Sequence, residues 1–280
     1  MKLKSYTFDN SHCKDINKIC ICFYGLTRSL KRTYPYFKKF LFDILDENNI
    51  VYDIYIHTYS LDILTNKRSN EHGVKLDNEE YKMLNIKESI IENQNDFDES
   101  FDYSKVIKYG DSWKDDFNSL KNLIRQLNSL KQVTSLIKNR EEYDNYLYIR
   151  PDLQFVEKID INFLKYKQSS PYLLTPDFGK GPDKKGLNDR FAIGDYFSII
   201  KYGERIDLIY DYMQNHGKLH SERLVKYLHI NNNIFNIIID IMLLRVRSSG
   251  HIARNDIRDL KRYCNTHKKK YCINKYIIIN

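Results

Sequence analysis

An arginine and an aspartate two residues apart follow the apolar run in "YLYIRPDLQF" (146–155). Arg150 and Asp152 flank Pro151, which stiffens the backbone and removes an N–H donor. Where a buried strand ends, one or two carboxylates can hold Mg²⁺ or Mn²⁺, with diphosphate oxygens and water as the remaining ligands. Asp152 would then be the metal ligand, and Arg150 would neutralise phosphate charge or fix the carboxylate. The alternative is a strand end with a surface ion pair.

A second candidate for phosphate binding is "FYGLTRSL" (23–30), which follows another apolar run. Tyr24 and Gly25 precede a turn, and Arg28 lies just beyond it. A backbone turn and an arginine at a strand's carboxyl end can hold a pyrophosphate, although a plain strand-to-helix turn has the same sequence. The chain has no Gly-rich phosphate loop of the P-loop or dinucleotide-binding type.

Three more residues suit a nucleotide ligand. His57 lies near the end of "VYDIYIHTY" (51–59), where it can stack on a base, bond a sugar, or simply be a satisfied strand-end histidine. Arg245 and Arg247 alternate within "IMLLRVRSSG" (241–250), a predicted strand, so their side chains share one face. They either bind diphosphate or form exposed sheet surface.

The elements that must position these residues alternate along the first 150 residues. Apolar runs that end in glycine or are rich in aromatic residues predict strands. From Phe117 onwards, apolar residues recur at spacings of three to seven, which predicts a helix with one buried apolar stripe. The predicted order is strand 16–25, helix 37–48, strand 51–59, a polar irregular segment 60–100, strand 104–110, a helix from 117, and strand 145–149. This alternation predicts an α/β fold with a mostly parallel, Rossmann-like sheet, in which ligands bind outside the carboxyl ends of the strands.

The second part of the chain is less regular. It contains a Gly/Pro-rich loop at 176–190, sheet-like sequence at 190–200, helices at 202–213 and 221–229, the latter with Ser221 as N-cap, the strand at 241–250, and a basic helical tail. No linker or internal repeat divides the sequence. We therefore predict a single domain over 1–280, with a nucleotide-binding half at 1–155, an acceptor- or sugar-binding half at 156–250 and a basic tail at 251–280.

Composition limits the classes of function. The net charge of +8 suits nucleic acid, an anionic membrane or a phosphorylated small molecule, but the positive residues are spread over the chain without a nucleic-acid-binding motif. No apolar run is long enough to span a membrane, no signal region is recognisable, and five cysteines without scaffold spacing fit reduced thiols. These features predict a cytoplasmic protein that does not bind nucleic acid.

Several blocks together resemble a known family. "YLYIRPDL" preceded by "RQLNSLKQV" and followed by "NDRFAIGD" and "SERLVKYL" is similar to a group of glycosyltransferases of large DNA viruses and some bacteria that have the nucleotide-sugar-binding GT-A fold. The similarity covers roughly residues 18–250. In better-known members of that fold Asp-x-Asp stands where this chain has "RPD". Only Asp152 matches the metal-binding aspartate, because Arg150 occupies the earlier acidic position, and an arginine can replace part of the cation's role.

The resemblance also implies roles for other residues. Gln126 and Ser129, one helical turn apart, would face the nucleotide or be ordinary polar residues. Asp189, next to Arg190, is a candidate catalytic base or acceptor of a sugar hydroxyl's hydrogen bond. Glu222 is its rival as a base, although its charge also suits a helix N-terminus.

The resemblance implies transfer of a sugar from a nucleoside-diphosphate sugar to a glycan or protein acceptor, with Mn²⁺ or Mg²⁺ as cofactor. Such displacement at the anomeric carbon needs a cation or arginines to stabilise the leaving diphosphate, and an inverting enzyme needs a carboxylate base. The alternative is a non-catalytic nucleotide- or glycan-binding module of the same fold.

Overall fold

A mixed sheet runs through the computed structural model, which describes residues 2–139, 142–181 and 183–266. In this part of the chain the sheet has eight strands, in the order β1-β11-β9-β10-β7-β2-β3-β6. Their bounds are β1 Ser5–Thr7, β2 Lys18–Tyr24, β3 Val51–Ser60, β6 Ile86–Asn93, β7 Asn145–Ile149, β9 Tyr172–Pro176, β10 Phe191–Gly194 and β11 Phe235–Ile239. All neighbours are parallel except β10, which is antiparallel to β7 and β9. The predicted α/β fold with a mostly parallel sheet is confirmed.

Two small antiparallel sheets accompany the large one. In the first, β8 (Leu153–Phe155) pairs with β12 (Leu243–Arg245), which brings the start of β8 beside the end of β12. In the second, β4 (Ile63–Asn66) and β5 (Glu71–Lys75) form a hairpin.

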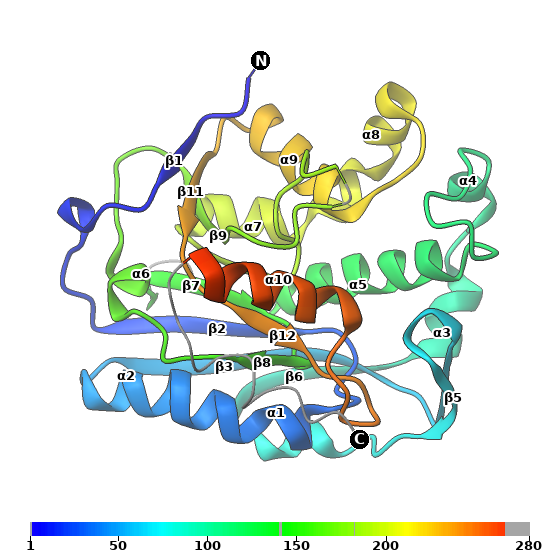
Figure 1. Ribbon diagram of the computed structural model, residues 1–280, viewed down its shortest axis with the longest axis horizontal. Coiled ribbons are helices and arrows are strands. Elements are labelled where there is room, and N and C mark those ends of the chain that lie inside the picture. Colours follow the sequence, from blue (N-terminus) through cyan, green and yellow to red (C-terminus); the bar gives the residue numbers. More distant parts are fainter. Residues whose placement is uncertain (1, 140–141, 182, 267–280) are drawn as a thin grey trace.

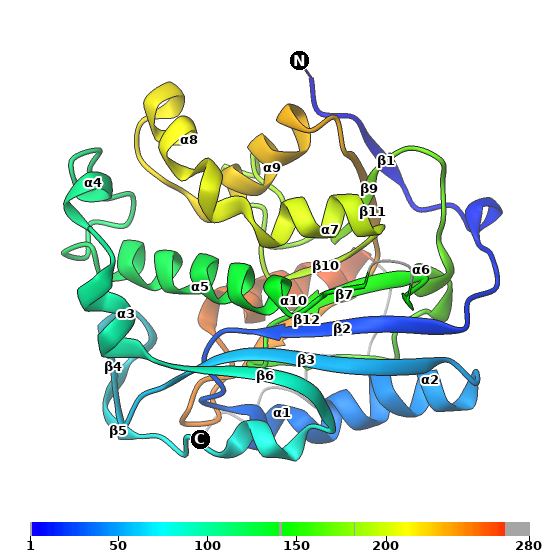
Figure 2. The ribbon, with the colours of Figure 1, turned by 180° about the vertical axis from the view of Figure 1, so that it is seen from behind.

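Helices cover both faces of the large sheet (Figures 1 and 2). On one face lie α1 and α2, joined by the π-helical segment η2, and on the other lie α5 and α7. The α-helices are α1 Leu30–Phe37, α2 Asp43–Glu47, α3 Gln94–Ser100, α4 Ser104–Ile107, α5 Asn118–Ser135, α6 Ile161–Lys165, α7 Tyr196–Gly203, α8 Ile209–His216, α9 Ser221–Asn231 and α10 Arg254–Thr266. Short helical segments are η1 Asn10–His12, η2 Lys38–Phe42, η3 Lys67–Ser69, η4 Glu80–Met83 and η6 Arg205–Leu208.

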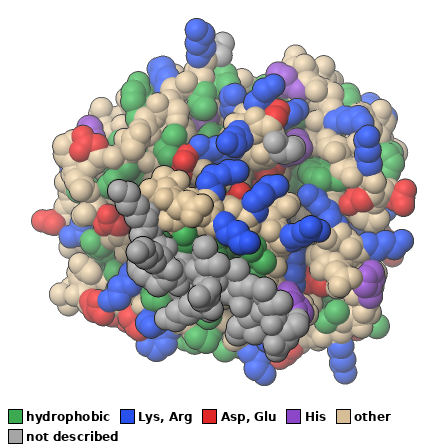
Figure 3. All heavy atoms as spheres, in the orientation of Figure 1, with side chains coloured by type: hydrophobic (Ala, Val, Ile, Leu, Met, Phe, Trp, Pro, Cys, Tyr) green, Lys and Arg blue, Asp and Glu red, His purple; other side chains and the backbone are tan. Residues whose placement is uncertain are grey.

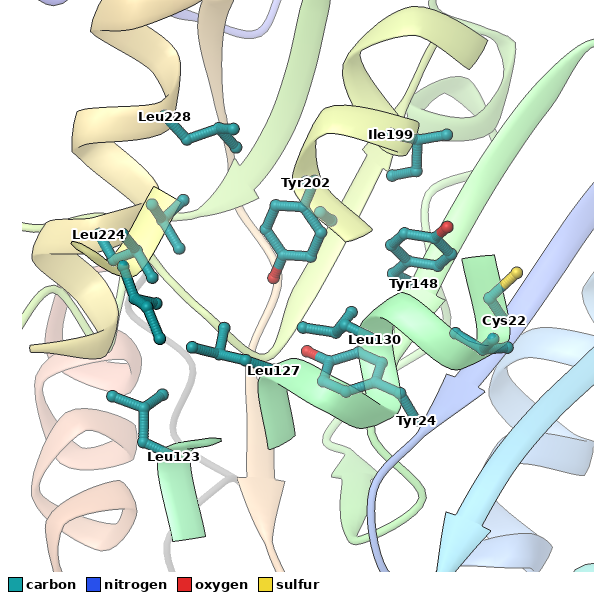
Figure 4. Packing of buried hydrophobic residues seen from close by; sticks show 14 of the residues in the cluster. Cys22, Tyr24, Leu123, Leu127, Leu130, Tyr148, Ile199, Tyr202, Leu224 and Leu228 are labelled. Atoms are coloured by element: carbon teal, nitrogen blue, oxygen red, sulfur yellow. The ribbon is translucent and has the colours of Figure 1, made fainter. Parts of the chain in front are cut away.

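Strand β2 contributes side chains to the hydrophobic core on both faces of the large sheet. Successive side chains of a strand point to opposite faces, so Ile21 and Phe23 pack toward α1 and α2, whereas Cys22 and Tyr24 pack toward α5. Figure 4 shows Cys22 and Tyr24 among leucines of α5 and α9 and tyrosines of β7 and α7. A strand that is buried on both faces reads as a continuous apolar run, which is why the sequence revealed it.

Two predictions for the first half are wrong. The segment 104–110 is not a strand, because Ser104–Ile107 forms the helix α4. The segment 60–100 is not irregular: it contains the β4–β5 hairpin, strand β6 and helix α3. Strand β6 lies at the edge of the sheet, where partly buried and exposed residues alternate, and five of the eight residues in its sequence "IKESIIEN" are polar.

The second half needs smaller corrections. The sheet-like sequence 190–200 divides into β10 and the helix α7, whose N-cap is Asp195. Ser221 is the first residue of α9, and the N-cap is His220, whose side chain makes no capping hydrogen bond. The predicted helical tail is confirmed over α10, and residues 267–280 lie outside the described residues. No described helix combines the length and apolar character that crossing a bilayer requires.

Candidate active site

A large cleft of about 1460 Å³ lies at the edge of the sheet where the parallel strands end. Among the described residues, fifteen basic side chains line it against seven carboxylates. Figure 3 shows Lys and Arg gathered on the face that carries α10. The basic residues are Arg28, Lys67, Arg68, Lys114, Arg125, Arg150, Lys180, Lys184, Arg190, Lys218, Arg223, Arg245, Arg247, Arg258 and Arg262, and the acidic ones are Asp98, Asp111, Asp152, Asp177, Asp189, Glu222 and Asp259.

The strand directions explain why residues far apart in sequence meet here. The turn after β2 contributes Arg28, and the turn after β7 contributes Arg150 and Asp152. Strand β10 is antiparallel, so it begins at the edge where its neighbours end, and Asp189 and Arg190 directly precede it. The strand-end position predicted for Asp152 is therefore confirmed.

Asp152 is bound by two arginines. Its side chain is only 2% exposed. It accepts hydrogen bonds from Arg150 Nε (2.9 Å) and Nη2 (2.6 Å) and from Arg28 Nη2 (3.0 Å). Burial alone would raise the pKa of this carboxyl, but the Arg150 and Arg28 guanidiniums outweigh burial and hold the pKa well below its usual value.

A second aspartate, Asp256 of α10, holds another arginine pair in the same way. It accepts bonds from Arg245 Nε (3.0 Å) and Nη2 (2.7 Å) and from Arg190 Nη1 (3.1 Å). Burial would raise its pKa as well, and the Arg190 and Arg245 guanidiniums instead hold it well below the usual value. The cleft wall thus contains two units in which one buried aspartate fixes two arginines.

Arg247 differs from these four arginines. Its Nε is buried and has no hydrogen-bond partner among the described residues. Burial, with the nearby positive charges of Arg28 and Arg245, lowers its pKa to about 9. The backbone fixes its position, because Val246 N–H donates to the Asp152 carbonyl at 2.8 Å and ties the end of β12 to the turn after β7.

Asp189 lies beside the arginines with one oxygen unused. Its backbone carbonyl accepts a hydrogen bond from Tyr24 Oη at 2.8 Å, which anchors the residue. Gln126 Nε2 lies 3.4 Å from Asp189 Oδ2, while Gln126 Oε1 accepts a bond from Arg150 at 2.8 Å. Asp189 Oδ1 is buried, and no described residue bonds to it. Arg190 Nε lies 3.7 Å away, too far for a hydrogen bond.

Glu222 lines the cleft but is already engaged. It accepts a bond from Ser221 Oγ at 2.6 Å, and His220 Nδ1 lies 3.0 Å away without hydrogen-bond geometry. Burial would raise its pKa, but His220, Ser221 and Arg190 lower the pKa to about 2. A carboxylate with so low a pKa is a weak proton acceptor.

Two predicted nucleotide contacts do not reach the cleft. His57 and Ser129 are fully buried, and their side chains bond each other at 2.8 Å. Ser129 Oγ also accepts from Gly25 N–H at 2.7 Å, and His57 Nε2 lies 3.2 Å from Glu92. The pair fixes the turn after β2, in which Gly25 has φ +100°. The remaining predicted site residues all line the cleft: Tyr24, Gly25, Arg28, Gln126, Arg150, Asp152, Asp189, Arg190, Glu222, Arg245 and Arg247.

The donor set does not fit the predicted Mn²⁺ or Mg²⁺ at Asp152. Hard divalent cations need several free oxygen ligands. Both Asp152 oxygens accept from guanidiniums, and in the described part of the chain no group of three or more His, Cys, Asp or Glu is placed to hold a metal ion. Metal dependence stays a prediction.

Sequence reasoning missed two anchoring carboxylates. Asp256 lies in what the sequence presented as a basic tail. Glu71, on the β4–β5 hairpin, is 1% exposed and accepts from Arg28 Nη1 (3.0 Å) and from Ser248 N–H (2.9 Å) and Oγ (2.8 Å). A charge within a polar segment carries no sign of burial when one of its partners comes from a distant part of the chain, as Arg190 does for Asp256 and Ser248 for Glu71.

Comparison with known proteins adds no family assignment. No family model matches the chain, and no curated protein has significant similarity to it. The geometry of the cleft is therefore the basis for inferring function.

Proposed function

We propose that the chain is a glycosyltransferase of GT-A-like fold that moves a sugar from a nucleoside-diphosphate sugar to a glycan or protein acceptor. The observation that carries the proposal is the arginine-lined cleft at the strand ends, with the unpartnered Oδ1 of Asp189 beside it. Arginines match the diphosphate of such a donor, and a free carboxylate oxygen matches the hydroxyl of an acceptor.

The reaction is displacement at the anomeric carbon. The acceptor oxygen forms a bond to that carbon while the bond between the carbon and the diphosphate oxygen breaks. Asp189 takes the acceptor's proton, and the electron pair of the broken bond stays on the diphosphate, beside the arginines. Of the two predicted carboxylates we assign Asp189 as the base, because its Oδ1 has no partner among the described residues. Glu222 accepts a bond from Ser221, and its pKa is lowered to about 2.

The test is release of nucleoside diphosphate by the full chain from a panel of nucleotide sugars, with glycan and protein acceptors. Asp189→Asn should lower kcat by about 10²–10⁴-fold, the usual contribution of a general base. Glu222→Gln should lower it less than about tenfold. Absence of binding, hydrolysis and transfer with every donor would refute the proposal.

A second candidate is a non-catalytic nucleotide- or glycan-binding module. It is favoured by one observation, that guanidiniums occupy the carboxylate that the resemblance assigns to a metal. Binding of nucleoside diphosphates without turnover of any donor would support this function over transfer.

A further inference from the structure

The two aspartate units hold four guanidiniums in place before any ligand arrives. Asp152 bonds Arg28 and Arg150, and Asp256 bonds Arg190 and Arg245. Each guanidinium has five N–H donors. The bonds to these aspartates use one or two donors of each, so every arginine keeps donors for a further acceptor.

Asp152 and Asp256 act on these arginines as positioning residues. A buried carboxylate that takes a guanidinium side-on, through Nε and Nη2, fixes its plane, as Asp152 does for Arg150 and Asp256 for Arg245. Ordering the side chain in advance lowers the entropy cost of binding. Asp152 and Asp256 are 2% and 0% exposed, so a ligand in the cleft meets mainly the arginines.

The unpartnered Nε of Arg247 indicates that this part of the cleft binds an anion. Buried polar groups almost always have a partner, and a buried charge without one is costly. Arg247 has a buried Nε without a partner among the described residues, and it lies near two further arginines, Arg28 and Arg245. The carboxylates that attract it, Asp152 and Glu71, are already bonded by other groups. An anion between the two units would satisfy it.

We infer that Arg28, Arg150, Arg190, Arg245 and Arg247 form a preorganised, metal-independent site for the diphosphate of the donor, an inference that rests on the proposed function. The five arginines outnumber the three carboxylates that bond them, Asp152, Asp256 and Glu71, so the site keeps a positive charge that attracts the diphosphate. In transfer, these guanidiniums stabilise the charge that develops on the leaving diphosphate.

The test is isothermal titration of the full chain with inorganic pyrophosphate in EDTA, repeated with Mn²⁺. We expect binding in EDTA, changed less than about threefold by Mn²⁺. Because a hydrogen bond to a charged group contributes about 1.5–3 kcal/mol, Arg247→Ala should weaken binding by about 10- to 100-fold, and Arg247→Lys by less. Arg223→Ala is the matched control: it removes a positive charge from the cleft rim, where Arg223 pairs with Asp183, and should change binding less than about threefold.

Thermal unfolding separates this role from a structural one. Arg247→Ala removes a half-buried guanidinium whose buried Nε has no partner among the described residues, so without ligand the variant should be at least as stable as the natural chain, while the stabilisation by pyrophosphate should largely disappear. A variant that binds pyrophosphate normally, or a natural chain that binds it only with Mn²⁺, would overturn the inference.

The pyrophosphate-binding test and the test of glycosyl transfer can fail separately. Metal-free, Arg247-dependent binding without turnover leaves the diphosphate site standing and contradicts the proposed function. Transfer that requires Mn²⁺ and resists Arg247→Ala does the reverse.

Discussion

Asp152→Asn distinguishes an arginine anchor from a metal ligand. Asn keeps one acceptor oxygen but turns an N–H donor toward guanidiniums that now bond both carboxylate oxygens. Removing one partner of a buried ion pair typically costs 3–5 kcal/mol, and we expect about 3 kcal/mol here because one acceptor remains. At about 2–4 °C per kcal/mol, the Tm should fall by roughly 6–12 °C.

The assay is thermal unfolding of the ligand-free chain at pH 7 in EDTA. Asp177→Asn is the control, because Asp177 also lines the cleft, is 63% exposed and pairs with Lys180 at the surface. Its cost should stay below about 1 kcal/mol. If Asp152 were a metal ligand, its negative charge would be unfavourable in the absence of the cation. Replacing it with the neutral Asn would then leave the stability of the chain unchanged or raise it. That result for Asp152→Asn would refute the anchoring role.

The natural chain offers a measurement that needs no variant. The folded pKa of Asp152 is lowered, so its carboxyl stays ionised to lower pH in the folded chain than in the unfolded one. Its contribution to stability is therefore complete above the unfolded pKa of about 4 and declines as pH falls through and below that value. Asp152→Asn should flatten this decline.

Three further predictions concern the scaffold. Burial lowers the pKa of His229 to about 4 in the folded chain. Lowering the pH from 7 to 5 should therefore reduce the free energy of unfolding by about 2 kcal/mol, because the unfolded chain takes up a proton that the folded chain does not. Unfolding curves measured at both pH values should show a smaller loss in His229→Gln. A Cβ at Gly203 would lie 1.9 Å from Thr134 Oγ1, so Gly203→Ala should destabilise by about 1–3 kcal/mol in urea unfolding, with partial recovery in the double variant Gly203→Ala/Thr134→Ala. Glu71→Ala should release the β4–β5 hairpin, seen as faster amide exchange there while α5 keeps its protection; unchanged exchange in the hairpin would contradict this.

Local patterns were enough to predict the elements that form the sheet centre. The two-sided burial of β2 and β7 gives continuous apolar runs, and the rule that parallel strands end at one edge placed Arg28, Arg150 and Asp152 together. Edge strand β6 was missed because half of its side chains are solvated. The segment of α4 was misassigned because Val and Ile favour strands, whereas tertiary packing buries Val106 on a helix.

The site was predictable only as far as its position. The bonds of Arg190 with Asp256 and of Arg28 with Asp152 join residues more than 60 positions apart, which local patterns do not reveal. Arg150 and Arg245, in contrast, bond aspartates only two and eleven residues away. His57 and Ser129 are polar residues near the correct edge, and their mutual hydrogen bond buries both. The position of each residue in the sequence therefore predicted which edge of the sheet it lies at, and its hydrogen-bond partners determine whether its side chain lines the cleft.

The uneven distribution of charge affects how fast ligands arrive. Among the described residues, the cleft lining carries fifteen basic side chains against seven acidic ones, an excess of eight. An anion near the mouth of the cleft therefore meets a focused positive field. Such a field accelerates association by roughly 10–10³-fold and is screened beyond about 8 Å at physiological ionic strength. Association rates should therefore fall steeply with added salt, while dissociation rates, set by buried guanidinium contacts, change little.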